Sequence, residues 1–163
     1  MTVTALVAIL SLMSGVIGTV LGVLNFLRDR AAAVEVSLPW DMSVTPGTGY
    51  DTNKKWGVIT VANIGRRPIF VSHVAIRLPK NASIKGGYSH LVIPSGISGK
   101  TLTEGAPTER YVVTQDDLER YAAHWRGMVA QVSDASGRVW RSKRLRSNQK
   151  PSWADPPSGA ISK

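Results

Sequence analysis

The side chains that could do acid–base or metal chemistry are few and far apart in this chain. The three histidines, His73, His90 and His124, lie in different segments, and none has another metal-ligand residue type three or four positions away. Zinc sites usually place their ligands at such short spacings. Asp116 and Asp117 are adjacent, so on a helix they would point about 100° apart and could not form a catalytic pair by themselves. We therefore expect no catalytic, metal or cofactor site, and a protein that is not an enzyme.

Positive charge is the strongest chemical signal in the sequence. The formal net charge is +9 and the pI is near 10.3, and all of this charge lies after residue 27. The densest basic run contains no acid and consists of Arg138, Arg141, Lys143, Arg144, Arg146 and Lys150. Beside a bilayer, such a run attracts anionic lipid at about 1 kcal/mol per basic residue, and it would attract nucleic acid phosphates by the same electrostatics. A solvated strand edge, charged against edge-to-edge pairing, also explains it. Nucleic acid is the less favoured partner, because Trp140 alone in the run offers base stacking.

An apolar segment at the start of the chain determines where these residues act. The first 27 residues carry no charged side chain, and Arg28, Asp29 and Arg30 follow directly. At about 1.5 Å per helical residue, the segment from Thr2 to Leu27 is long enough to cross a hydrocarbon core of roughly 30 Å. We predict a single-pass signal-anchor helix with its flank at residues 1–30, and hence a membrane protein.

Two other interpretations of this segment fit less well. A cleaved secretory signal would use the small residues 31–33 as its cleavage site, but it needs a basic start and an apolar core of only about 7 to 15 residues. A buried core helix would show a polar stripe, whereas the polar positions here are few and uncharged. Lys and Arg near a span resist translocation, so Arg28 and Arg30 predict an outside N-terminus and a cytoplasmic C-terminal domain.

Small residues within the apolar segment suggest that the helix pairs with another helix. Ser14, Gly18 and Gly22 recur every four residues and therefore lie on one side of a helix. Small residues at this spacing let a second helix approach closely, although Gly and Ser are also common in spanning helices that do not pair. We expect a homo-oligomer formed through this face.

The sequence of residues 33–146 predicts one β domain. Short segments rich in β-branched residues and bounded by turn formers occur at residues 34–38, 56–63, 69–78, 88–93, 109–114, 128–133 and 139–143. In the third segment, the expected buried face comprises Phe70, Ser72, Val74, Ile76 and Leu78. Residues 41–55 are expected to form a long exposed loop, and residues 147–163, rich in proline and serine, a disordered tail.

Two local signals complete the predicted layout. Thr114 can cap a helix from Gln115 to about Trp125, with acidic residues in its first turn. Its apolar stripe, expected in the core, comprises Leu118, Tyr121, Ala122 and Trp125. Asp134 and Gly137 stand at the first and fourth positions of a type I turn, which predicts a hairpin.

The segment VANIGRRPIFVSHVAI, residues 61–76, resembles the second and third strands of bacterial immunoglobulin-like or fibronectin-like domains, where an Asn-x-Gly turn and a proline join two core strands. The whole layout resembles small uncharacterised bacterial proteins that pair one spanning helix with such a domain. The resemblance implies a mainly β, antiparallel Ig-like sandwich with one short helix, and it implies no activity.

Together these features predict a membrane-tethered, non-enzymatic β-sandwich that binds a protein partner at the membrane surface. One alternative is an effector whose helices assemble and permeabilise the bilayer. A second is a binder of anionic lipid or nucleic acid through the basic run.

Overall fold

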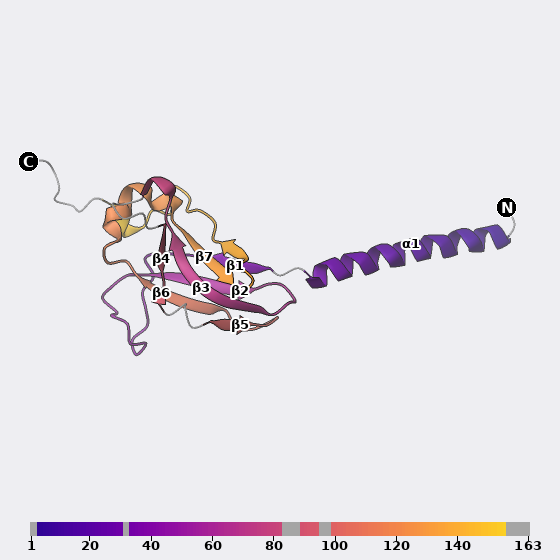
Figure 1. Cartoon of the computed structure of the whole chain (residues 1–163), viewed down its shortest axis with the longest axis horizontal. Coiled ribbons are helices and arrows are strands. Elements are labelled where there is room, and N and C mark those ends of the chain that lie inside the picture. Colours follow the sequence, from indigo (N-terminus) through magenta and orange to yellow (C-terminus); the bar gives the residue numbers. More distant parts are fainter. Residues whose placement is uncertain (1–2, 31–32, 83–88, 95–98, 156–163) are drawn as a thin grey trace, which may run out of the picture.

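The computed structural model describes residues 3–30, 33–82, 89–94 and 99–155, and it consists of one N-terminal helix and two antiparallel sheets (Figure 1). Helix α1 (Val3–Arg30) forms a rod outside the sheets. Its segment Val3–Leu27 is long and apolar enough to span a membrane, and no part of the apolar window is buried. An apolar N-terminal helix followed by a mainly β domain is therefore confirmed.

The strands form two sheets of different size. The first has the order β1-β2-β6, with β1 (Val34–Ser37), β2 (Trp56–Asn63) and β6 (Glu109–Thr114). The second has the order β4-β3-β7-β8, and β5 also pairs with β3; its strands are β3 (Ile69–Arg77), β4 (His90–Val92), β5 (Lys100–Leu102), β7 (Val129–Asp134) and β8 (Val139–Arg141). Every predicted segment contains a strand, while β5 was not predicted. Tyr88, the expected start of the fourth segment, lies outside the described residues.

The core lies between the two sheets. Ile59 and Val61 of β2, Ile76 of β3 and Val132 of β7 have no exposed surface and belong to one cluster. Burial of aliphatic side chains from both sheets in one layer is the packing of a sandwich.

The predicted buried face of β3 is wrong at its first position. Phe70 is 48% exposed, and its neighbours Ile69 and Val71 are buried instead. The pairing register with β7 shifts between Val71 and His73, so β3 contains a bulge there. An extra residue changes which side chains point inward, and the predicted alternation therefore holds only after the bulge.

The predicted helix is present, but it is of the 3-10 type and begins later in the sequence than Gln115. It is a 3-10 helix, η3 (Leu118–Gly127), and Asp117 before it has a left-handed backbone with φ of 65°. The Thr114 hydroxyl accepts a hydrogen bond from the Asp116 N–H at 3.1 Å, so it stabilises the preceding turn rather than capping the helix. The apolar stripe packs into the core as predicted.

The hairpin at Asp134 is confirmed. The Gly137 N–H donates to the Asp134 carbonyl at 3.1 Å, and Gly137 has φ of 82°. The Asp134 carboxylate accepts hydrogen bonds from the Ser136 N–H at 2.8 Å and the Arg138 N–H at 2.9 Å. Desolvation raises the pKa of Asp134, but hydrogen bonds from Ser136 and Arg138 and the charge of Arg138 lower it on balance. The turn is thus held by one carboxylate.

The predicted disordered tail is wrong for residues 147–155, which we call the C-terminal strap. Within it, η4 (Ser152–Ala154) buries Trp153, whose ring meets that of Trp40 edge to face at 5.4 Å. The Ser152 N–H donates to the Asp41 carboxylate at 2.8 Å, and the Ser152 hydroxyl hydrogen-bonds the same carboxylate. A large buried aromatic ring outweighs the proline- and serine-rich composition. The domain therefore extends to Asp155; residues 156–163 of the predicted tail lie outside the described residues.

Candidate functional site

The strand order gathers basic side chains at one end of the second sheet. Arg77, the last residue of β3, pairs with Val129 of β7, and Arg141 of β8 pairs with Gln131. Directly opposed residues of antiparallel strands project to the same face, so Arg77 and Arg141 lie on one face on either side of β7. The Arg141 Nε donates to the Gln131 Oε1 at 3.1 Å, which fixes one of these guanidinium groups.

The antiparallel pairing with β7 continues one residue beyond β8 and positions the next basic residues. Ser142 is buried; its N–H donates to the Ala130 carbonyl at 2.9 Å, and its hydroxyl accepts from the Ala130 N–H at 3.0 Å. Lys143 and Arg144 follow directly and are exposed. The backbone N–H and carbonyl of the buried Ala130 thus hold the chain directly before Lys143.

These side chains surround a hollow of about 590 Å³, which we call the basic hollow. Its cations come from four places in the fold: Arg77 of β3, Lys80 of η1 (Lys80–Ala82), Arg141 of β8 and Arg144 beyond it. No acidic residue is among those that line it. A Cβ on Gly127 would lie 2.9 Å from the Pro79 ring, so glycine is needed for the end of η3 to pack against the turn that carries Lys80.

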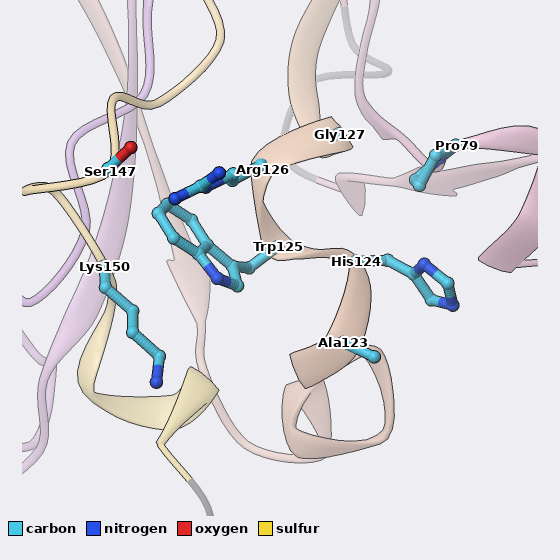
Figure 2. Close-up of a pocket in the computed structure, with 8 residues that line it drawn as sticks. All are labelled: Pro79, Ala123, His124, Trp125, Arg126, Gly127, Ser147 and Lys150. Carbon is cyan, nitrogen blue, oxygen red and sulfur yellow. The ribbon is translucent and has the colours of Figure 1, made fainter.

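A second hollow, of about 570 Å³, adjoins the basic hollow through Pro79 and Gly127 and is drawn in Figure 2. Here the Arg126 guanidinium lies 5.3 Å from the centre of the Trp125 ring, in a cation–π arrangement. Lys150 also lines this hollow, and His124 points away from the Trp125 ring (Figure 2). Lys150 Nζ is 2.5 Å from the Asp155 carboxylate, so its charge is paired.

A third hollow, of about 720 Å³, lies between β1 and the segment after β8. It shares Arg141 and Arg144 with the basic hollow and adds Lys143, Arg146 and a wall of β1 residues. Glu35 is the one acidic residue among those that line the three hollows. We call the cations around the hollows the basic face: Arg77, Lys80, Arg126, Arg141, Lys143, Arg144 and Arg146.

The basic face differs in membership from the predicted basic run. Four of the six predicted residues, Arg141, Lys143, Arg144 and Arg146, lie on it. Arg138 sits in the hairpin and lines none of the three hollows, and Lys150 is paired with Asp155. The residues that the sequence did not signal are Arg77, Lys80 and Arg126, because they join the run only through the β3–β7–β8 pairing and the packing of η3.

The charge of the basic face is uncompensated within the part of the chain that the structure describes. None of its seven residues forms an ion pair with another described residue. A concave surface of one charge sign concentrates its field and raises the local concentration of oppositely charged ligands. The arrangement can therefore bind anions, and its guanidinium groups suit phosphate or carboxylate oxygens.

The second predicted site, on α1, has its small residues where the sequence placed them. Apart from the flanking residues and the backbone of the adjacent turns, no atom lies within 4 Å of where a Cβ on Gly18 or Gly22 would stand. The Ser14 hydroxyl donates to the Leu10 carbonyl at 2.9 Å. Gly15 and Asn25 belong to the same face at helical spacing. The face is open, and helix pairing through it stays a prediction.

The residues with catalytic or metal-binding potential remain separate. His73 lies in β3, His90 in β4 and His124 in η3. Within residues 3–30, 33–82, 89–94 and 99–155, no group of three His, Cys, Asp or Glu side chains could hold a metal ion. Asp116 is bound by Lys54 at 2.8 Å, which anchors the long 41–55 loop to the start of η3.

Neither a protein-family model nor a curated protein sequence matches this chain.

Proposed function

We propose that this chain is a membrane-tethered, non-enzymatic binding module that holds an anionic partner at the membrane surface through its basic face. The observation that carries the proposal is the basic face itself: seven cations without ion pairs among the described residues, around three adjoining hollows. A charged edge that only prevents aggregation would be served by cations along one strand, whereas these come from β3, η1, η3 and the segment around β8.

The helix supplies the second half of the proposal. A spanning α1 keeps the domain within a few residues of the bilayer, since β1 begins at Val34. Tethering raises the local concentration of the domain at the surface, so modest affinity for an anionic partner suffices. The partner is an acidic protein surface at the membrane or the anionic headgroups of the membrane itself.

We also assign the domain to the immunoglobulin-like sandwiches. If β4 and β5, which both pair with β3, together take the place between strands C and E, then β1-β2-β6 corresponds to strands A, B and E of such domains and β3-β7-β8 to strands C, F and G. This order supports the assignment, and the absence of cysteine separates the chain from members stapled by a disulfide.

The proposed orientation places the N-terminus outside and the domain in the cytoplasm, because Arg28 and Arg30 follow the apolar segment. A reporter fused after Lys163 should then be active in the cytoplasm and protected from protease added to intact cells. Protease access from outside would contradict the orientation and move the binding face to the other side of the membrane.

The binding role is tested with the full chain in neutral phosphatidylcholine nanodiscs. We expect co-flotation with phosphatidylglycerol vesicles that weakens steeply with salt, and further weakening in Lys143→Gln/Arg146→Gln. The matched control, Arg67→Gln/Arg110→Gln, removes the same charge away from the basic face and should bind like the parent. Equal weakening by both pairs, or no binding by the parent together with no partner recovered from native membranes, would refute the role.

The small-residue face of α1 favours a second candidate, an effector that assembles in the bilayer and permeabilises it. Gly18→Leu/Gly22→Leu keeps the helix apolar but pushes a partner backbone away, which should weaken self-association by about 1 to 2 kcal/mol. The control, Val16→Leu/Val20→Leu, changes another face and should do little. This candidate further requires that overexpression collapses the membrane potential and that the glycine variants abolish the collapse; an intact potential excludes it.

A further inference from the structure

We infer that the basic hollow binds the phosphate group of a phosphomonoester or pyrophosphate ligand, with Arg77 and Lys80 as its specific contacts. The inference deepens the proposed binding role and rests on it. It assigns a ligand to one hollow, whereas the proposed binding role requires only the summed charge of the basic face.

The basic hollow differs from its two neighbours in its charge. Four cations line it and no acid does, whereas the hollow beside β1 contains Glu35 and the one around Trp125 contains the paired Lys150. Three of the four cations are arginines, whose planar guanidinium groups can each donate two hydrogen bonds to phosphate oxygens.

The walls of the hollow are fixed by the fold. Arg77 is held by the β3–β7 pairing, Arg141 by its hydrogen bond to Gln131, and Arg144 by the buried peptide of Ser142 two residues earlier. Lys80 follows Pro79, which packs against Gly127 with no room for a Cβ between them. Because the backbone positions of the four cations are fixed before binding, an anion has to order only their side chains.

The charge and size of the hollow select the ligand class. A carboxylate carries one charge and would leave most of the four cations unpaired, whereas a phosphomonoester carries about −1.5 to −2 at neutral pH and presents three acceptor oxygens. A volume of about 590 Å³ lies within the range of small-ligand sites and admits a diphosphate or a phosphorylated headgroup.

The test uses the full chain in phosphatidylcholine nanodiscs and inorganic pyrophosphate as the probe, measured by titration calorimetry. We expect saturable binding that Arg77→Gln/Lys80→Gln weakens roughly tenfold or more, because two charge-assisted contacts are lost. Lys143→Gln/Arg146→Gln removes the same charge from the basic face outside the basic hollow and should change the affinity less than about twofold. Unchanged thermal unfolding shows that both variants are folded.

Three results would overturn the inference: no pyrophosphate binding by the parent at low salt, equal weakening by both variant pairs, or no weakening by the Arg77/Lys80 pair. Each leaves the proposed role separately testable, since that role depends on vesicle binding and on Lys143 and Arg146. Conversely, pyrophosphate binding by a chain that neither binds vesicles nor recovers a partner from native membranes would retain the site and remove the membrane-surface role.

Nanodisc composition distinguishes the two sources of the phosphate group. If a lipid headgroup fills the basic hollow, phosphatidic acid in the protein's own nanodisc should compete and lower the pyrophosphate affinity. Phosphatidylglycerol, a phosphodiester, serves as the control for surface charge. If the ligand is a soluble phosphate compound, the two anionic nanodiscs should give the same affinity.

Discussion

Replacing Trp153 by alanine tests whether the C-terminal strap is part of the core. The Trp153 ring is 7% exposed and meets Trp40 edge to face. Burial of roughly 200 Å² at about 25 cal/mol per Å² stabilises the fold by about 5 kcal/mol, and the ring pair adds about 1 kcal/mol. The buried indole Nε1 has no hydrogen-bond partner among the described residues, so its removal returns about 1 to 3 kcal/mol. We expect Trp153→Ala to lower the free energy of unfolding by about 4 kcal/mol, within the usual range for buried tryptophan.

The assay is urea unfolding of the full chain in detergent, followed by circular dichroism of the β domain. With a urea slope of about 2 kcal/mol per M, the midpoint should fall by roughly 2 M. Trp153→Phe keeps an aromatic ring and removes the unpaired N–H, so it should cost less than about 1.5 kcal/mol. Ser147→Ala, at an exposed position of the strap, should stay within about 0.5 kcal/mol of the parent. If Trp153→Ala unfolds at the parent's urea midpoint, the strap is not packed, and the sequence-based tail starting at residue 147 would be the better description.

Three further predictions concern the turns and the long loop. Gly137→Val should cost about 1 to 3 kcal/mol in urea unfolding and Gly137→Asn less. The reason is that φ is 82° and no atom outside the flanking residues lies within 4 Å of an added Cβ, so only the backbone conformation opposes the change. The lowered pKa of Asp134 means that it binds fewer protons folded than unfolded; it stabilises the fold above its unfolded pKa, near 4, and this stabilisation is lost as pH falls through the folded pKa. Asp134→Ala should therefore flatten the acid side of the stability–pH profile, and an unchanged profile would contradict the hydrogen-bonded turn. A hydrogen bond from Lys54, then one from Thr114, lowers the pKa of Asp116, so an NMR titration of Lys54→Met should find that pKa raised toward its ordinary value.

The elements that the sequence predicted are those decided by neighbouring residues. Alternation of apolar side chains located most strands, and an Asp and a Gly three residues apart located the hairpin. Strand β5 was missed because its three residues, Lys100–Leu102, contain no alternation and are defined by their pairing with β3. The exposure of Phe70 accompanies a bulge in β3 that is visible only in its pairing with β7, about 60 residues further along the chain.

The strap and the basic hollow escaped prediction for a related reason. Trp153 lies among prolines and serines, a composition typical of disorder. Its partner Trp40 contacts it in the fold but lies near the opposite end of the domain in the sequence. Arg77 and Lys80 are isolated cations in the sequence, and only the strand order brings them beside Arg141 and Arg144. The basic run was visible because its residues lie close together in the sequence, whereas the concave shape of the surface they form was not.

The contact between the strap and the residues after β1 also orders events during synthesis. Of the described residues, those of α1 leave the ribosome first, and Ser152 and Trp153, which contact Asp41 and Trp40, are among the last to leave. The domain therefore completes its core only after the apolar helix has been synthesised, and if α1 spans the membrane as proposed, the unfinished chain is held near the bilayer in the meantime. Contacts of long sequence separation form slowly, so such a chain exposes unpaired strands for longer than a domain closed by local contacts. We expect strap variants to be lost in cells mainly to membrane-bound proteases, before any folded protein accumulates.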